Sequence, residues 1–508
     1  MKFTPGTVLP VAFAMLLFTV SAGAETYYVS TTGDNGNSGT SPGSAFATIQ
    51  YAADIVTEGD SVLVLDGEYA GFDLRTSGSQ TSPIVFAAMY DNAVINQQNP
   101  VTADGINIEN AEWIIIDGFN LTGLPRNGVR VAVSSNVTVR YCLCEYCDSR
   151  GIFTGFADWV TIEHNECCYS VTEHGIYTSN SGDHPVIRFN HCHHNNGCGI
   201  HMNGDLSSGG DGIISDAIVE ANIIHDNGQS GGSGINCDGV VESVIFNNLL
   251  YNNHSSGISL YRIDGATGSH DVEIYNNTIV QPDDGRWGIN INTGSTNATL
   301  RNNIVLSAHS WRGSIKIDAS SMPGFTSDYS ILEDRLSIDG GSTVITLQQW
   351  QIYGYDIHSQ VCSSWSDLFL NWQQEDYHIT SSSQATDTGT DEVQSIVQFD
   401  LDGITRPQGT GWDIGSYEYS TTGIDPDPHT ISQPGHISSP GMLTFIELPS
   451  GSSVTVFDIC GRRITRLYET DGQAVWNTGR VPCGIYLYVL SSSGNIHIYG
   501  NKAVIVRN

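Results

Sequence analysis

The amino-acid sequence predicts an all-β protein: a parallel β-helix followed by a small C-terminal β-sandwich. The first observation is a glycine followed by an apolar residue that returns at positions 105, 128, 151, 175, 199, 234, 257 and 288. The intervals are 23, 23, 24, 24, 35, 23 and 31 residues, which is the period of a structural unit stacked on itself. The second is a column of asparagines at one place of each repeat, and the third is a group of alternating strands near the C-terminus.

The chain of 508 residues begins with a predicted secretory signal at residues 1–24. Lys2 precedes an apolar stretch, and Ala22-Gly23-Ala24 supplies the small residues of a cleavage site. No later segment is apolar for long enough to span a membrane, so we expect a secreted or cell-surface protein. Residues 46–56 predict a short amphipathic helix and residues 61–65 a strand, which together suit the N-terminal cap of a solenoid.

Two columns of residues recur within the repeats. The predicted turn column consists of Asn165, Asn190, Asn222, Asn248, Asn277 and Asn303. The column two residues later consists of Cys144, Cys167, Cys192, Ile224, Leu250, Ile279 and Val305. Alternate side chains of a strand face opposite sides, so the second column should lie inside, where a free cysteine behaves as a small hydrophobe. The asparagines are predicted to form a ladder of stacked side-chain amides at a tight turn.

Several segments resemble secreted right-handed parallel β-helix proteins related to pectate lyases. They are Tyr27-Tyr28-Val29-Ser30, FATIQYAADIV at 46–56 and GDSVLVLDGEY from Gly59, then HGIYTSNSGD, GCGIHMNGD, SGISLYRIDG and NNTIV, and finally RPQGTGWDIGSYEY from Arg406. The resemblance implies a right-handed β-helix with its cap over residues 25–320 and a C-terminal end segment over 321–420. Because that superfamily contains lyases, hydrolases, epimerases and proteins of unknown role, the resemblance implies the fold and not the activity.

The last part of the chain differs in composition. Residues 421–440 are rich in Pro, Gly, Ser and Thr and are predicted to be a linker. Residues 441–508 contain alternating strands that suit a small β-sandwich. They resemble the C-terminal sorting domain of bacterial type IX secretion cargo, which implies the type IX secretion machinery as a partner, although an ordinary accessory β-sandwich is the alternative. Cys460 and Cys483 depart from the usual motif, and a disulfide between them is a further prediction.

The charge of the chain restricts its partners. There are 54 acidic and 20 basic residues, for a net charge of −34. Such a surface should repel nucleic acid, and a polyanionic substrate would need local arginine, lysine or a bound cation. We therefore expect no binding of nucleic acid. A monomer is a separate prediction.

The strand that follows each glycine is predicted to present two outward residues per coil, a coil being one turn of the solenoid. The pairs are Asn107/Glu109, Arg130/Ala132, Phe153/Gly155, Tyr177/Ser179, His201/Asn203, Asn236/Asp238, Ser259/Tyr261, Asn290/Asn292 and Lys316/Asp318. The two long intervals add residues just after this strand, at 204–216 and 262–270. Loops on either side of a short coil are predicted to form the walls of a cleft, unless they are merely tolerated insertions.

This cleft is predicted to bind a polysaccharide, with cleavage by β-elimination of a uronate polymer. Elimination needs a cation at the carboxylate, a base for the C5 proton and an acid for the leaving oxygen. The predicted catalytic residues are His201, Tyr261, Asp238 and Arg262. His201 and Tyr261 are the best placed as base and acid, and Arg262 or Arg286 is expected to hold the carboxylate. The predicted substrate-binding residues are Tyr177, Asn203, Asn236, Ser259, Arg286, Trp287 and Asn290. Asp205, Asp211 and Asp264, with Asp238, offer hard oxygen ligands for Ca²⁺.

Three alternatives accompany this prediction. Asp205 and Asp238 could act as the carboxylate pair of a glycoside hydrolase. The protein could also bind glycans or form an adhesive rod without catalysis. Finally, the strings HNECC from His164 and HCHHNN from His191 resemble metal ligands, but their spacing is not that of a known zinc site and they should lie on another face of the solenoid. We interpret them as structural, with a transition-metal site as the alternative.

Overall fold

The computed structural model describes residues 23–90 and 92–420, together with 436–439, 442–445, 448, 453–458, 463–468, 470, 472–478, 484–492 and 495–505. The predicted signal segment lies almost wholly outside these residues. Most of the predicted linker does too, as do Cys460 and Cys483. The predictions made for those parts of the chain therefore stay predictions.

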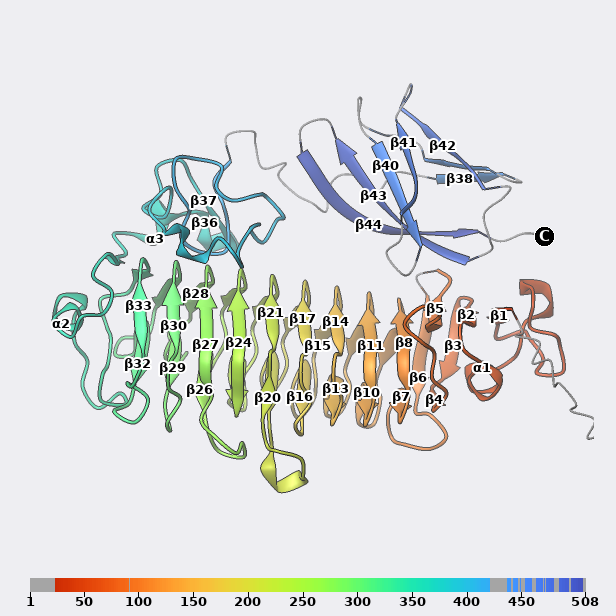
Figure 1. Cartoon of the computed structure of the whole chain (residues 1–508), viewed down its shortest axis with the longest axis horizontal. Coiled ribbons are helices and arrows are strands. Elements are labelled where there is room, and N and C mark those ends of the chain that lie inside the picture. Colours follow the sequence, from red (N-terminus) through yellow and green to blue (C-terminus); the bar gives the residue numbers. More distant parts are fainter. Residues whose placement is uncertain are drawn as a thin grey trace, which may run out of the picture.

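Three parallel sheets, called A, B and C here, form the walls of the predicted solenoid (Figure 1). Sheet A contains β1 (Thr26–Val29), β2 (Ser61–Val64), β5 (Ile84–Ala88), β8 (Glu112–Asp117), β11 (Ser135–Arg140), β14 (Thr161–Glu163), β17 (Val186–Arg188), β20 (Ile214–Ser215), β21 (Ile218–Glu220), β24 (Val240–Phe246), β27 (His270–Tyr275), β30 (Thr299–Arg301) and β33 (Thr326–Asp328).

Sheet B contains β3 (Gly67–Ala70), β6 (Ala93–Gln97), β9 (Asn120–Thr122), β12 (Leu143–Glu145), β15 (Glu166–Cys168), β18 (His191–His193), β22 (Ile223–His225), β25 (Leu249–Tyr251), β28 (Thr278–Gln281), β31 (Ile304–Ser307), β34 (Ile331–Leu332) and β35 (Gln360–Val361). Sheet C contains β4 (Phe72–Leu74), β7 (Ile106–Glu109), β10 (Asn127–Ala132), β13 (Arg150–Gly155), β16 (Ile176–Ser179), β19 (Ile200–Asn203), β23 (Ser233–Asp238), β26 (Ser256–Tyr261), β29 (Ile289–Ile291) and β32 (Ile315–Ile317).

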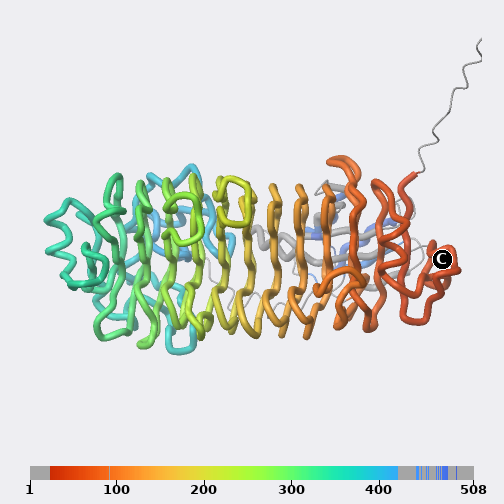
Figure 2. The backbone as a smooth tube through the Cα atoms, turned by 90° about the horizontal axis from the view of Figure 1, so that it is seen from below, coloured from red at the N-terminus to blue at the C-terminus, as the bar shows by residue number. Residues whose placement is uncertain are grey.

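The repeating glycine stands where one coil passes close to the next. A β carbon at Gly128 would lie 2.6 Å from the carbonyl oxygen of Gly151, and one at Gly151 would lie 2.7 Å from that of Gly175. Only glycine therefore allows the backbones to approach to the spacing of paired strands, about 4.8 Å. Figure 2 shows the resulting stack of coils along one axis.

The predicted asparagine ladder is confirmed. The Asn165 side-chain amide donates to Asn190 Oδ1 at 3.0 Å, and the same contact continues through all six asparagines to Asn303. Each amide also donates to a backbone carbonyl, such as Val139 O at 2.9 Å from Asn165. A second ladder through Asn195, Asn227 and Asn253 was not predicted.

The prediction that the column two residues after the asparagines points into the core is confirmed as well. Cys144, Cys167 and Cys192 pair in register in sheet B and continue through Ile224 and Leu250. All are buried, and the cysteines are free thiols. They contribute apolar packing rather than cross-links.

Caps close both ends of the solenoid core. The N-terminal helix is α1 (Ile49–Ile55), and it begins after Thr48 because the Thr48 side chain accepts the Tyr51 N–H at 3.2 Å. Ile49, Ala52 and Ala53 of α1 are buried. At the other end, α2 (Leu347–Gln351) buries Trp350 against Phe325.

The segment after β35 turns back along the solenoid. It contains α3 (Trp365–Leu368), β36 (Phe369–Asn371) and β37 (Asp376–Ile379), and its Phe369 and Tyr377 share a buried cluster with Leu249, Tyr251 and Ile304 of sheet B. The same segment packs Val393 and Trp412 on Phe246 and Tyr275 of sheet A. Sheets A and B are thus covered over the later coils.

The C-terminal strands form two antiparallel sheets. One contains β38 (His436–Ser439), β39 (Met442–Phe445) and β42 (Ala474–Asn477), and the other contains β40 (Ser453–Asp458), β41 (Arg463–Tyr468), β43 (Gly484–Ser492) and β44 (Asn495–Ile505). Phe445, Val456 and Trp476 from the two sheets belong to one buried cluster, as expected for a small β-sandwich.

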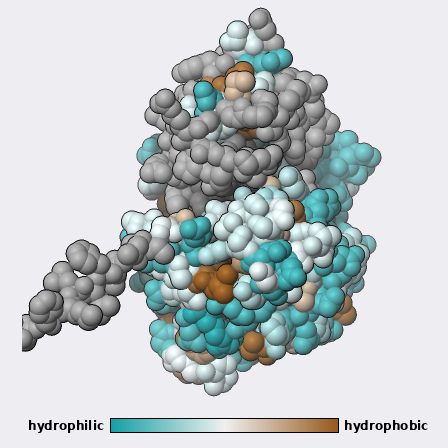
Figure 3. All heavy atoms as spheres, turned by 90° about the vertical axis from the view of Figure 1, so that its right-hand side faces the viewer, coloured by the Kyte–Doolittle hydropathy of each residue, from teal (hydrophilic) through white to brown (hydrophobic). Residues whose placement is uncertain are grey.

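Short helical turns and the surface complete the described structure. Single 3-10 turns occur at Pro42–Ser44, Leu206–Ser208, Trp372–Gln374 and Asp391–Val393. Figure 3 shows a mainly hydrophilic surface at the N-terminal end of the solenoid, in keeping with the acidic composition. Within the described chain, no helix combines the length and hydropathy of a membrane span.

Candidate functional site

The outer face of sheet C carries the predicted column of outward residues. The strand register pairs Phe153 with Tyr177, Tyr177 with His201, His201 with Asn236, and Asn236 with Ser259. Asn290 and Lys316 continue the column. The alignment deduced from the glycine repeat is therefore confirmed, and one face holds these polar and aromatic side chains.

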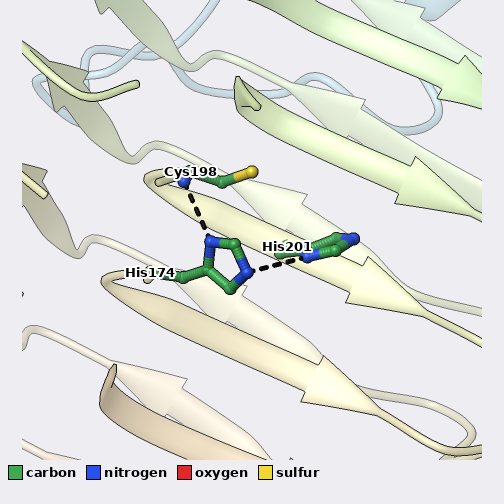
Figure 4. A group of neighbouring side chains, drawn as sticks. All are labelled: His174, Cys198 and His201. Carbon is green, nitrogen blue, oxygen red and sulfur yellow. Dashed lines mark hydrogen bonds between the residues drawn. The ribbon is translucent and has the colours of Figure 1, made fainter. Parts of the chain in front are cut away.

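A chain of hydrogen bonds joins three of these coils. Figure 4 shows His174 between the backbone N–H of Cys198 and the ring of His201. The Cys198 N–H donates to His174 Nδ1 at 2.9 Å, and His174 Nε2 lies 3.1 Å from His201 Nδ1. His201 Nε2 in turn lies 3.5 Å from the hydroxyl oxygen of Tyr261. His174 was not among the predicted site residues.

The Cys198 amide fixes the tautomer of both rings. A backbone N–H can only donate, so His174 Nδ1 accepts and a neutral His174 carries its proton on Nε2. That proton is donated to His201 Nδ1, which leaves the proton of His201 on Nε2, facing Tyr261. His201 therefore has no free lone pair, and its predicted role as a base is corrected to that of a donor.

Burial keeps both imidazoles neutral. Burial, with a smaller contribution from Arg150, lowers the pKa of His201 to about 3. Burial, followed by the charges of His201 and Arg150, holds the pKa of His174 well below its usual value. The Tyr177 ring stacks on His201 at 4.7 Å between centroids and covers one face of this imidazole. Protonation near neutral pH does not disturb the tautomers.

Tyr261 receives two donors. Besides His201 Nε2, the Asn236 side-chain amide donates to the hydroxyl oxygen at 2.6 Å. Ser233 donates to Asn236 Oδ1 at 3.1 Å, which fixes the orientation of that amide. Since both neighbours donate, the hydroxyl hydrogen of Tyr261 is available to a ligand at this half-buried position. Burial raises the pKa of Tyr261 above its ordinary value, so the phenol is the resting form.

Several predicted substrate-binding residues are buried beneath the hydrogen-bond network of His174, His201 and Tyr261. Asn236 and Ser259 are buried, and Ser259 Oγ accepts from Asn290 at 3.2 Å. Asn203 is also buried and donates to the Tyr177 hydroxyl at 3.1 Å. Trp287 is only 6 % exposed. The prediction that these four side chains line the cleft is corrected, because their burial leaves Tyr177, Asn290 and Arg286 as the accessible members.

The two long loops lie against each other. The Leu206 N–H donates to Asp264 O at 2.9 Å, and the Ala266 N–H donates to Gly212 O at 2.9 Å. They form a joined projection instead of two separate walls. Asp238 lies beneath it, 1 % exposed, and its carboxylate accepts the backbone N–H groups of Ile263, Asp264 and Gly265.

This position corrects the predictions made for Asp238. Both of its oxygens are occupied by backbone amides, so it anchors the second loop and is neither a catalytic residue nor a partner of Asp205 in a hydrolase pair. Asp205 accepts from Ser207 and Ser208, and Asp211 accepts the Ile213 N–H. Within the described residues, Asp205, Asp211 and Asp264 do not gather into a group of three ligand atoms. Calcium binding by these three aspartates stays a prediction, because their carboxylates do not converge on one point.

Three cationic side chains, those of Arg286, Arg312 and Lys316, belong to the two coils that follow β26. Lys316 lies two strands from β26 in sheet C, about 10 Å at the strand spacing of parallel sheets. Burial lowers the pKa of Lys316, the charge of Asp318 opposes this, and the charges of Arg312 and Arg286 lower it further. Arg312 Nη1 also donates to Gly285 O at 3.2 Å, next to Arg286 in the chain. Arg312 was missed, although it precedes Ser314 by two residues just as Arg286 precedes Gly288. Arg262 is exposed in the loop.

A cavity of about 370 Å³ opens at the other side of the network. Its lining includes Arg126, Arg130, Arg150, Phe153 and Asn180, none of which was predicted to act there. The Arg150 guanidinium lies 4.8 Å from the centre of the Tyr177 ring and so connects the cavity to the His201 network. All three arginines are paired with carboxylates, those of Asp104, Glu109 and Glu173.

The His174 cluster does not favour a metal ion. Ligand atoms of His174, Cys198 and His201 do lie within 4.8 Å of one another. However, both nitrogens of His174 already have hydrogen-bond partners, the Cys198 N–H at Nδ1 and His201 Nδ1 at Nε2. The hydrogen-bonded arrangement of two neutral imidazoles is the better description.

Comparison with known proteins supports the fold. Residues 88–208 and 168–327 match the family model described as a right handed beta helix region. Pectate lyase Pel9A is similar in structure over 78 % of this chain and 97 % of its own, with 16 % sequence identity and a TM-score of 0.53. No match was found among curated proteins.

Two further solved structures are similar over smaller parts of the chain. An alginate lyase from Paenibacillus sp. is 16 % identical over 57 % of this chain and 95 % of its own, with a TM-score of 0.40. The A-module of a mannuronan C-5 epimerase from Azotobacter vinelandii is 16 % identical over 61 % and 91 %, with a TM-score of 0.41.

Proposed function

We propose that this β-helix protein is a polysaccharide lyase that cleaves a uronate-containing glycan on the outer face of sheet C. The observation that carries the proposal is the Tyr261 hydroxyl, which is held by two donors. It lies on the same sheet as Lys316, two strands away. A fold similar to that of pectate lyase Pel9A supports a glycan as the ligand. A sugar chain that crosses the coils would contact Tyr177, Tyr261 and Asn290 in turn.

The chemistry follows from the hydrogen-bond pattern. The phenolate of Tyr261 accepts the C5 proton of the uronate, and the phenol then returns this proton to the leaving glycosidic oxygen on the same side of the sugar. His201 Nε2–H and the Asn236 amide both donate to the phenolate oxygen and stabilise its charge. Arg286, Arg312 and Lys316 would neutralise the substrate carboxylate, which makes the C5 proton more acidic.

The proposal is tested with purified protein on a set of uronate and neutral polysaccharides, with and without Ca²⁺. We expect ultraviolet absorbance of an unsaturated uronate, together with new reducing ends, on at least one uronate polymer. New reducing ends without this absorbance would indicate hydrolysis and overturn the lyase assignment. Binding with neither signal would favour the noncatalytic alternative. A dependence on Ca²⁺ would support the predicted cation.

The rate should rise with pH. The reactive form is the phenolate, and burial raises the pKa of Tyr261, so the phenolate fraction grows about tenfold per pH unit throughout the range below that pKa. We therefore expect kcat/KM to increase steadily between about pH 6 and pH 9, in contrast to a bell-shaped optimum near neutrality. Such an optimum would indicate a titrating histidine and contradict the assignment, because the pKa of His201 lies near 3.

We also propose that the protein is exported and that residues 441–508 act as a type IX sorting domain. The two antiparallel sheets of this region support a compact C-terminal module. Mass spectrometry of the protein from the medium of the native host would test both parts. We expect a mature chain that begins near Glu25, and its retention in the periplasm after removal of residues 441–508.

A further inference from the structure

A cluster of histidines lies on the outer face of sheet B, away from the proposed active site. The strands β15, β18 and β22 pair in register, with Glu166 beside His191 and with His193 beside His225. Cys167, Cys192 and Ile224 alternate with these residues and are buried in the core. Glu166, His191, His193 and His225 therefore project together from three consecutive coils.

The ligand atoms of this cluster converge. His191 Nε2 lies 2.7 Å from His225 Nε2, and His193 Nε2 lies 3.2 Å from Glu166 Oε1. Atoms of Glu166, His191 and His193 lie within 4.8 Å of one another. Four ligands placed tetrahedrally at about 2.0–2.1 Å from an ion are about 3.3 Å apart. Three of the groups are already mutually close, and His225, which also belongs to a second group with His194 and Asp226, reaches them through its contact with His191. A shift of the His225 ring would bring the fourth ligand to coordination distance.

Neighbouring groups orient two of the rings. Asp226 Oδ2 lies 2.7 Å from His225 Nδ1, and His194 Nδ1 lies 2.9 Å from His193 Nδ1. In each ring the Nδ1 contact leaves Nε2 directed at the shared centre. A carboxylate that holds the far nitrogen of a ligating histidine is the usual outer layer of a metal site, because it fixes the tautomer and makes the imidazole a better ligand.

We propose that Glu166, His191, His193 and His225 bind one Zn²⁺ ion or a similar divalent transition-metal ion. Imidazole and carboxylate ligands suit this class of ion. The HCHHNN string contributes His191 and His193 from one strand, and the third imidazole comes from the next coil. This is why spacing within a short sequence does not match a zinc motif.

The ion would join three coils at the border of the covered part of sheet B. Tyr251 stacks on His225 at 4.6 Å between ring centroids and contacts Tyr377 of the returning segment at 5.2 Å. Glu166 is the exposed member of the set, with a side chain 49 % exposed, so the ion can enter from solvent. The ion is expected to stabilise the three coils next to the returning segment, independently of the proposed lyase activity.

Titration calorimetry of the full chain with Zn²⁺, and absorption spectroscopy with Co²⁺, test the site. We expect one ion per chain, a tetrahedral Co²⁺ spectrum and a rise in thermal midpoint with Zn²⁺. His191→Gln and His225→Gln should abolish these effects, and Asp226→Asn should weaken binding by about 10- to 100-fold.

Two control variants locate the ion. His270→Gln changes an imidazole that contacts Asp271 on sheet A, and it should bind Zn²⁺ as the unchanged protein does. His174→Gln removes a ligand of the alternative cluster on sheet C and should also leave binding unchanged. Zn²⁺ uptake that survives His191→Gln and His225→Gln, or that is lost in His174→Gln, overturns the assignment. So does the absence of stoichiometric uptake by the unchanged protein.

Discussion

Replacing Tyr261 by phenylalanine is expected to abolish nearly all cleavage while the polysaccharide still binds. The substitution removes only the hydroxyl that carries both proton transfers, and the loss of a positioned acid–base group costs about 10²- to 10⁴-fold in kcat. The half-buried aromatic ring remains in β26, and only the contacts of the oxygen with Asn236 and His201 are lost. The measurement is the initial rate of unsaturated product, together with affinity electrophoresis in gels that contain the substrate.

Tyr177→Phe is the matched control for this experiment. Tyr177 lies on the same face and is also half-buried, but its hydroxyl is bound to Asn203 and not to His201 Nε2. We expect its kcat to change by no more than a factor of about ten, since a single neutral hydrogen bond contributes about 0.5–1.5 kcal/mol at most to the positioning of the ring. Similar losses in the two variants, or a Tyr261→Phe protein with more than a tenth of the original rate, would refute the role of Tyr261.

Replacing Asn248 by alanine is expected to lower the free energy of unfolding by about 3–5 kcal/mol, because several buried polar groups lose their partners at about 1–3 kcal/mol each. Asn248 Oδ1 accepts both the backbone N–H and the side-chain amide of Asn222, at 3.0 and 2.9 Å. Its own amide donates to Val219 O, Phe246 O and Asn277 Oδ1. All of this lies in the interior, where water cannot replace the missing bonds.

Urea unfolding followed by tryptophan fluorescence measures this effect, with Asn196→Ala as the control. Asn196 is a partly exposed asparagine of a turn, and its side chain makes one bond of 3.3 Å to Thr172 O. Its replacement should change stability by no more than about 0.5 kcal/mol. If the two variants unfold at the same urea concentration, the ladder does not stabilise the coils in the way its geometry indicates.

The repetitive part of this protein could be predicted from sequence alone. A period near 23 residues places each side chain over its counterpart in the next coil, and strand alternation assigns each one to the core or the surface. That is sufficient for the cysteine column, the Asn165 ladder and the outward column from Phe153 to Lys316. His201 and Tyr261 were brought into one face by the same reasoning.

The chemical state of the site residues depends on individual contacts that do not repeat from coil to coil. The joined loops bury Asp238 under three backbone amides, and no repeat indicates that its carboxylate is already occupied. The Cys198 amide decides which nitrogen of His174 carries the proton, and hence that His201 is a donor.

The sequence by itself determined the solenoid and the face on which the site lies. Only the tertiary structure decided which groups on that face are free to react. The physical reason is that stacking depends on a regular spacing that the sequence repeats, whereas hydrogen-bond occupancy and burial depend on individual neighbours. The returning segment is one such neighbour: its Tyr377 packs on Tyr251 of sheet B. The cluster of Glu166, His191, His193 and His225 lies beside this contact.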